Sequence, residues 1–298
     1  MTLPNFILIG IQKAGTTSIY KYLAQHPQVY MSPVKEPRFL ARDWEQYYAE
    51  GGERRPDRID TLEKYTQLFE GVTDETAIGE ASANYLFYHQ TAARQIQRYV
   101  PEAKLVAVLR HPVERAYSDY LMHIRDGIRR EKRRPLIEQI RERQAQSHII
   151  QKGLYCERVK YFVDCFGAPQ VKVMLYDDLQ NSVVKFMQDL YSFLGVDPAF
   201  TPNTRTQLQK TQVPRSEALN YLLRQQNPWR RTVAAALKVF LAPNLRHQLR
   251  DTLLRLNSVG KEARPLREEE RQALLEIYRE DTLKLQDFLN RDLSAWLR

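Results

Sequence analysis

The stretch PNFILIGIQKAGTT, residues 4–17, decides the fold of this chain. Its apolar run is too short for a helix and lacks polar alternation, as is typical of a parallel strand buried on both faces. We therefore expect a strand over residues 5–10. The apolar positions that follow the stretch predict a helix over residues 16–25.

The turn between this strand and helix favours binding of an anion. Gly10 and Gly15 frame it, Lys13 lies inside it, and Thr16 or Thr17 could cap the helix. Backbone N–H groups and the positive end of the helix dipole would converge there with the lysine ammonium. A phosphate or sulfate fits such a turn.

The turn nearly matches the nucleoside-triphosphate loop G-x-x-x-x-G-K-[ST], but Thr16 stands where that motif has its lysine. Magnesium-dependent phosphoryl transfer also requires an acidic residue after a neighbouring strand. The best candidate strand, 105–110, ends in Arg110 instead. A nucleotide loop that has lost its activity, or a plain strand-to-helix turn, is the alternative.

Short apolar runs alternate with helical patterns along the chain, which predicts an α/β fold of three layers, with a central, mostly parallel sheet flanked by helices. Ligands in such folds bind beyond the carboxyl ends of the strands, where the Lys13 turn and Arg110 both fall. The further expected strands are 29–31, 77–80, 105–110 and 171–176, and the further expected helices are 91–99, 113–126, 148–166 and 178–194.

The chain is expected to form one domain, 1–298. Residues 1–200 would be the α/β core of a P-loop type, and 201–298 a mainly helical extension that needs the sheet to bury its apolar stripes. Prolines mark the transition between the two parts.

Composition limits the functional classes. The net charge of +9, from 45 Lys and Arg against 36 Asp and Glu, favours an anionic ligand, nucleic acid or a membrane surface. No apolar run approaches the roughly 20 residues that span a bilayer, so we expect a soluble, cytoplasmic protein. Cys156 and Cys165 fall on opposite faces of a predicted helix, and no cluster of metal ligands is apparent.

Two motifs resemble one enzyme family. IGIQKAGTTSIYKYL followed by HPQVYMSPVKEPRFL, and LVAVLRHPVERAYSDYLMH at residues 105–123, are similar to sulfotransferases that use 3′-phosphoadenosine 5′-phosphosulfate (PAPS), especially bacterial enzymes related to the Golgi carbohydrate type. The close match covers about residues 4–123. The resemblance implies PAPS as sulfuryl donor and no metal, because a lysine can take the metal's place.

The resemblance also assigns the donor site. Lys13 would be the catalytic cation, and the turn would bind the 5′-phosphate. Arg110 and Ser118 would hold the 3′-phosphate, although an ion pair of Arg110 with Glu114 and helix packing of Ser118 are alternatives. The expected donor-binding residues are Lys13, Ala14, Gly15, Thr16, Thr17, Arg110, Ser118, Lys261 and Arg264.

The acceptor side is expected around KEPRFL at 35–40, where carbohydrate-type relatives carry a catalytic glutamate. Glu36 is the proposed base, held extended by the following proline, or else a surface carboxylate paired with a neighbouring cation. Arg38 could weaken Glu36 as a base, or it could bind an anionic acceptor. Glu80 and Tyr85 are assigned to the cleft as structural or substrate-binding groups, and His111 is a less favoured base.

The resulting hypothesis is sulfuryl transfer to a hydroxyl, or an amine, of a carbohydrate, lipid or small natural product. A P-loop kinase or hydrolase using ATP and magnesium is one alternative, and a non-catalytic anion-binding protein is another. The basic stretch 124–143 could be a solvated face or an acceptor-side rim. Nucleic acid is not expected as a partner, because the stretch lacks interleaved aromatic residues.

Overall fold

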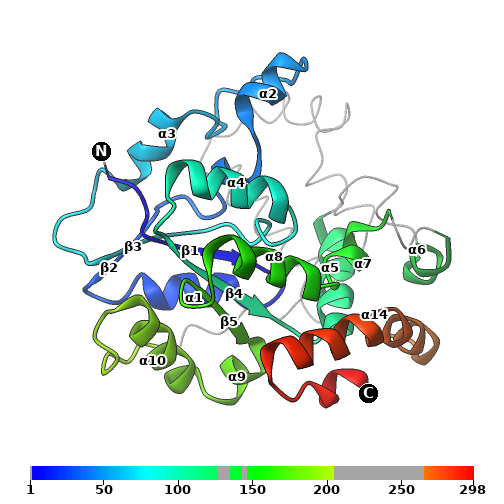
Figure 1. Ribbon diagram of the computed structural model, residues 1–298. Helices are drawn as coiled ribbons and strands as arrows, with labels where there is room; N and C mark the ends of the chain where they lie inside the picture. Colours follow the sequence, from blue (N-terminus) through cyan, green and yellow to red (C-terminus); the bar gives the residue numbers. More distant parts are fainter. Residues whose placement is uncertain (1, 127–134, 143–145, 205–264) are drawn as a thin grey trace, which may run out of the picture. The chain divides into compact units, whose positions relative to one another are not determined.

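The computed structural model describes residues 2–126, 135–142, 146–204 and 265–298 (Figure 1). The chain divides into two compact units, of which the first comprises residues 1–115, 152–208 and 278–298. The second comprises residues 116–151 and 209–277. The single domain over 1–298 stays a prediction.

The first unit is built on a sheet of five parallel strands, in the order β2-β3-β1-β4-β5. The register pairs Phe6 of the central strand with Gly79 on one side and with Lys104 on the other. All five strands were expected. They are β1 (Phe6–Gly10), β2 (Val29–Met31), β3 (Ala77–Ala81), β4 (Lys104–Leu109) and β5 (Val171–Leu175).

Helices cover both faces of this sheet, which confirms the predicted three-layer α/β fold. Figure 1 shows α4 (His89–Tyr99) and α8 (Cys156–Phe166) on one face, with α1 (Thr16–Leu23) and α10 (Val183–Leu194) on the other. The residues of β1 are all buried, as a strand between two helical layers requires. The two cysteines, both on α8, are free thiols.

Two helices that we expected to be continuous are interrupted. Residues 148–166 form α7 (His148–Gln151) and α8, because a new helix starts where the Asp281 carboxylate accepts the Tyr155 N–H at 2.6 Å and the Cys156 N–H at 3.2 Å. Residues 178–194 fall into α9 (Tyr176–Asn181) and α10. Ser182 separates these two as the N-cap of α10, accepting the Lys185 N–H at 3.3 Å.

Four short helical segments between β2 and β3 were not expected. They are η1 (Phe39–Ala41), α2 (Trp44–Ala49), α3 (Leu62–Thr66) and η2 (Gln67–Phe69). Side-chain caps start α2 and α3, where Asp43 accepts the Gln46 N–H and Thr61 accepts the Lys64 N–H. Helices of five or six residues are too short to show an apolar stripe, which is why periodicity misses them.

The C-terminal residues of the first unit pack on the sheet. Leu285, near the end of α14 (Glu268–Leu289), and Trp296, in the short helix η4 (Ser294–Leu297), belong to the same buried core as the strands. Trp296 Nε1 also donates to Asp177 Oδ2 at 2.7 Å, and Arg291 pairs with Asp178 at 2.6 Å. Residues 205–264 of the extension lie outside the described part.

The described part of the second unit is helical. It contains most of α5 (Pro112–Asp126), α6 (Leu136–Glu142), α7 and the first half of α14, and Arg141 of α6 pairs with Glu269 of α14. Residues 127–134 and 143 of the basic stretch lie outside the described residues, so its role stays a prediction. Among the helices that are described, none is long and apolar enough to cross a membrane.

Candidate active site

The turn after β1 presents the N-terminus of α1. Gly15 is the N-cap, in the left-handed region at φ +81°, and its carbonyl accepts the Ser18 and Ile19 N–H groups at 2.9 and 3.1 Å. Thr16 and Thr17 therefore occupy the first turn, and the expectation that one of them caps the helix is wrong. Because the first N–H groups of a helix have no intrahelical acceptor, the turn offers them to an anion.

Close packing requires a glycine at position 15. A Cβ there would lie 2.9 Å from the Tyr176 ring and from Leu179 Cδ2, both on α9. Such an approach is shorter than carbon atoms tolerate, and the positive φ also disfavours a side chain. The helix α9 therefore fixes the position of the turn.

Arg110 lies at the turn, as its place directly after β4 led us to expect, and it also contacts α9. Its Nη1 donates to the Lys13 carbonyl at 3.1 Å, and its guanidinium carbon lies 4.9 Å from the centre of the Tyr176 ring. The Arg110 carbonyl accepts the Tyr155 hydroxyl at 2.8 Å. The turn and the strand-end arginine thus form one basic cluster.

Two lysines lie at this turn. Lys13 is half-buried and has a left-handed backbone at φ +75°. Lys152 is 8% exposed, and its ammonium donates to Gln12 Oε1 at 2.6 Å. Lys152 belongs to the segment QKGLY, residues 151–155.

The other residues predicted to bind the donor differ in accessibility. Ala14 is fully buried and its N–H already donates to the Ile11 carbonyl, so it has little to offer a ligand. Thr16 is buried and Thr17 is exposed. Ser118 is buried on α5, in the second unit. Lys261 and Arg264 lie outside the described residues, and their roles stay predictions, as does that of Ser118.

Glu36 does not have the extended backbone expected before a proline. Its φ is +63°, in the left-handed region. Its N–H donates to the Ala81 carbonyl at 2.9 Å, and its Oε1 accepts the Ala83 N–H at 3.2 Å. These contacts with the end of β3 outweigh the local preference set by Pro37. Unusual backbone conformations of this kind often occur at functional sites.

The Glu36 carboxylate is paired with two cations. Oε1 lies 3.2 Å from Lys35 Nζ, and Oε2 lies 3.2 Å from Arg38 Nε. Both ion pairs fit the alternative role of Glu36, that of a surface carboxylate paired with a neighbouring cation. The side chain is nevertheless 18% exposed and lines a pocket, and about half of the Arg38 side chain is exposed.

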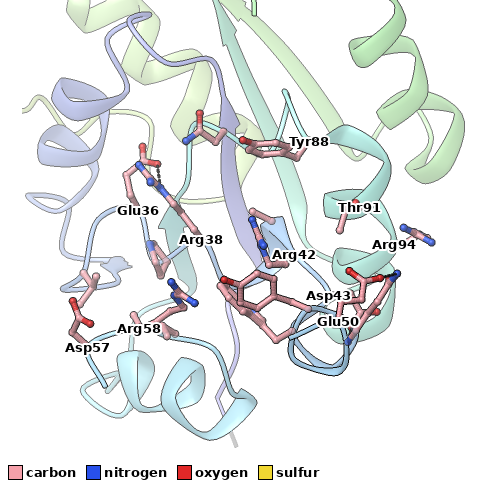
Figure 2. A pocket seen from close by; sticks show the side chains of 18 residues that line it. Glu36, Arg38, Arg42, Asp43, Glu50, Asp57, Arg58, Tyr88, Thr91 and Arg94 are labelled. Carbon is pink, nitrogen blue, oxygen red and sulfur yellow. Dashed lines mark hydrogen bonds and ion pairs between the residues drawn. The ribbon is translucent and has the colours of Figure 1, made fainter. Parts of the chain in front are cut away.

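The pocket beside Glu36 has a volume of about 640 Å³ and is lined by residues between 34 and 94 of the first unit. Figure 2 shows Glu36 and Arg38 on one side of it and Thr91 and Arg94 on the other. Its further polar and aromatic lining residues include Arg42, Asp43, Trp44, Tyr47, Glu50, Asp57, Arg58, Asn84 and Tyr88.

Stacked aromatic and guanidinium groups form one wall of the pocket. Arg42 lies 4.3 Å from the centre of the Tyr47 ring, and Arg58 lies 5.3 Å from that of Trp44. The two rings meet edge to face, with centroids 5.7 Å apart. This wall combines an apolar ring surface with hydrogen-bond donors, as sites for polar organic ligands do.

Glu80 and Tyr85 are fully buried, and no ligand in the pocket can touch them. Of their two predicted roles, only the structural one fits this burial. The Glu80 carboxylate accepts hydroxyl hydrogen bonds from Tyr85 at 2.7 Å, Ser82 at 2.8 Å and Tyr65 at 3.1 Å. Burial raises the pKa of Glu80 to about 7, although the three hydroxyl groups oppose that rise.

The segment after β3 connects the anion-binding turn with the Glu36 pocket. Leu86 N–H donates to the Ile9 carbonyl at 2.7 Å, and a Cβ at Gly10 would lie 2.6 Å from Leu86 Cβ. The same segment supplies the Ala83 N–H that holds Glu36. Both halves of the candidate site therefore pack against one short piece of chain.

His111, the less favoured base, is half-buried and lies 6.3 Å from the Trp296 ring, centroid to centroid. It is not among the residues that line the Glu36 pocket.

Sequence reasoning missed the aromatic and arginine wall of the pocket and the contact of Tyr176 with Gly15. A local signal existed for the wall, because aromatic residues and arginines are concentrated in residues 42–58. For Tyr176 there was none, since it follows β5 and meets the turn only through the fold.

The sequence matches the model of the sulfotransferase family over residues 4–202. Since this match covers about two thirds of the chain, the chain belongs to the sulfotransferase family. The structure is similar to that of a sulfotransferase from Alicyclobacillus acidocaldarius, with a TM-score of 0.67, 28% sequence identity and full coverage of both chains.

Curated relatives match parts of larger proteins. The chain is 35% identical over 136 residues to the membrane-associated sulfotransferase kil1 of Dictyostelium discoideum, covering 46% of this chain and 26% of that protein. It is 25% identical to mouse bifunctional heparan sulfate N-deacetylase/N-sulfotransferase 4, covering 99% of this chain and 31% of that protein. Mouse carbohydrate sulfotransferase 15 is 35% identical, with 40% and 27% covered. The chain thus spans about a quarter to a third of the length of these relatives.

Proposed function

We propose that this chain transfers a sulfuryl group from PAPS to a hydroxyl of a carbohydrate-like acceptor. The main observation behind the proposal is the basic cluster at the anion-binding turn. There Arg110 donates a hydrogen bond to the Lys13 carbonyl and stacks on Tyr176. Membership of the sulfotransferase family supports it.

The residues present fit such a donor. Gly15 is the N-cap of α1, and the first N–H groups of this helix suit a phosphate oxygen. Arg110 and Lys13 add positive charge, and Arg110 can offer a phosphate two donors at once. When bound, PAPS would supply an activated sulfuryl group and a phosphate leaving group. Roles of Ser118, Lys261 and Arg264 in donor binding are part of the proposal through the resemblance alone.

Two side chains of the chain take the proposed catalytic roles. The Lys13 ammonium would stabilise negative charge that develops on the leaving phosphate, which is a major source of catalysis in group transfer. The Glu36 carboxylate would accept the proton of the attacking hydroxyl from its place on the pocket wall. Lys35 and Arg38 hold the Glu36 carboxylate in one orientation, so that it would already be aligned when the acceptor binds.

The acceptor would enter through the pocket beside Glu36. Its ring wall of Trp44 and Tyr47 suits the apolar face of a sugar, and the surrounding arginines suit hydroxyl, carboxylate or sulfate groups. The names of two relatives, which refer to heparan sulfate and to carbohydrate, favour a carbohydrate over a lipid or another small natural product.

The P-loop kinase alternative has less support. A magnesium-dependent enzyme of that class needs an acidic residue to hold the metal near the phosphates. Of the two strands beside β1, β4 is followed by Arg110, whose guanidinium faces the turn. The other strand, β3, contains Glu80, but this carboxylate is fully buried.

Calorimetry with 3′-phosphoadenosine 5′-phosphate (PAP), compared with ADP plus magnesium, tests the proposal. We expect PAP to bind more tightly, because only PAP carries the 3′-phosphate. Equal or tighter binding of ADP would contradict it. Transfer of labelled sulfate from PAPS into glycans of a host-cell extract, followed by mass spectrometry, would then identify the acceptor.

A further inference from the structure

The segment that carries Glu36 is attached to the end of β3 by side-chain hydroxyl groups. The Arg38 N–H donates to Ser82 Oγ at 3.1 Å, and the Leu40 N–H donates to the Tyr85 hydroxyl at 3.2 Å. Each of these hydroxyls therefore acts as an acceptor toward the segment 36–40. The hydrogen of each hydroxyl must therefore point to another acceptor.

Both hydrogens point to one buried carboxylate. Ser82 donates to Glu80 Oε2 at 2.8 Å, and Tyr85 donates to Glu80 Oε1 at 2.7 Å. A hydroxyl has a single hydrogen, so its donation to Glu80 leaves its lone pairs for the backbone N–H. The carboxylate thus fixes the direction of both hydrogen bonds that hold the segment.

We infer that Glu80 is a positioning residue that holds the Glu36 segment in its working conformation, and that it does so as the ionised carboxylate. The inference rests on the proposed function, in which Glu36 is the base. Glu80 touches neither acceptor nor donor, because its side chain is fully buried.

Protonation of Glu80 would weaken this arrangement, because a neutral carboxyl accepts hydroxyl hydrogen bonds less strongly than a carboxylate does. A protonated carboxyl must donate one hydrogen, and a neighbouring hydroxyl must then turn to accept it. The groups facing Glu80 are the hydroxyls of Tyr65, Tyr85 and Ser82, and the charge of Glu36 also acts on it. Burial raises the pKa of Glu80 to about 7, so the switch would fall close to neutral pH.

The variant Glu80→Gln tests the inference. Its amide can accept from one hydroxyl but must itself donate to another, so the network is broken at every pH. We expect kcat to fall by ~10–100-fold, as for other supporting residues, while PAP affinity is unchanged. We also expect the fall in wild-type kcat near pH 7 on the acid side to be lost in the variant. An unaltered pH profile in a folded variant would overturn the inference.

Two tyrosine variants provide a matched comparison. Tyr85→Phe and Tyr65→Phe each remove one hydroxyl donor from the same oxygen of Glu80, but only the Tyr85 hydroxyl also holds the segment, through Leu40. Tyr85→Phe should lower kcat by ~10-fold. Tyr65→Phe should keep wild-type kcat at alkaline pH, and the acid limb of its kcat profile should move to higher pH. Equal loss of kcat in both variants would overturn the inference.

A readout without turnover separates this inference from the proposed function. Amide hydrogen exchange of residues 36–40, compared at the same pH, should be faster in Glu80→Gln and in Ser82→Ala than in the wild type. PAP binding without any sulfuryl transfer would contradict the proposed function and leave this result standing. Unchanged exchange in both folded variants would overturn the positioning role itself.

Discussion

The anion-binding turn and the Glu36 segment are both held in a fixed conformation, but by different interactions. The turn is held by backbone and by close packing, with Gly15 pressed against Tyr176 and Leu179. The Glu36 segment is held by polar side chains that converge on one buried carboxylate, Glu80. A backbone-built site depends little on protonation, whereas the side-chain network responds to pH.

The largest expected effect falls on the turn. Lys13→Ala should reduce sulfuryl transfer by about 10³-fold, because one fixed charge at the leaving group is lost. Labelled transfer from PAPS measures it. Lys21→Ala, at an exposed lysine on α1, the helix that follows the turn, is the control and should keep wild-type activity. A loss below tenfold in Lys13→Ala would contradict the catalytic role.

On the other side of the comparison, Glu36→Gln should reduce kcat by about 10²-fold through loss of the base. PAP affinity should be unchanged, since the turn is left intact. Glu45→Gln, an exposed carboxylate on α2, serves as the control. If Glu36→Gln lowered the melting temperature without lowering kcat, the paired-carboxylate reading would be the correct one.

The packing of the turn can be tested with two glycines of almost equal φ. Gly15→Ala should lower the free energy of unfolding by ~3 kcal/mol and weaken PAP binding, since its Cβ meets the Tyr176 ring. Gly51, at φ +83°, has nothing within 4 Å of its Cβ position. Gly51→Ala should therefore cost only ~1 kcal/mol, from the backbone alone. Chemical denaturation gives both values, and equal losses would show that packing at Gly15 is unimportant.

A dependence of stability on pH is also expected. The pKa of Glu80 is raised from 4.5 to about 7 in the folded protein, which therefore holds this proton more tightly than the unfolded chain does. Its contribution to the free energy of unfolding is complete below pH 4.5 and is lost as the pH rises to about 7. Denaturation across this range should show a steeper decline in the wild type than in Glu80→Gln. Parallel curves would argue against the raised pKa.

Contiguous features could be predicted from the sequence. The five strands, the parallel sheet and the meeting of Arg110 with the turn followed from apolar runs and from their order along the chain. The donor half of the site is mostly one continuous motif. This is why the local pattern of residues 10–17 predicted an anion-binding turn, to which the family resemblance then assigned the donor.

The acceptor half depends on contacts between distant segments. The left-handed backbone of Glu36 results from its hydrogen bonds to residues 81 and 83, which override the preference set by Pro37. The burial of Glu80 could not be inferred from its place at a strand end, because the helix α3 that supplies Tyr65 shows no periodicity. Tertiary contacts determine the backbone conformation and the burial of such residues, and local sequence patterns do not indicate these contacts.

The attachment of α9 to the end of the chain has a consequence for biosynthesis. The Tyr176 ring packs against the turn at Gly15, while Asp177 and Asp178 beside it bind Trp296 and Arg291. The ribosome makes the turn long before it makes Arg291 and Trp296. We therefore expect the binding turn to reach its final stability only after residues 291–296 have been synthesised and have bound α9.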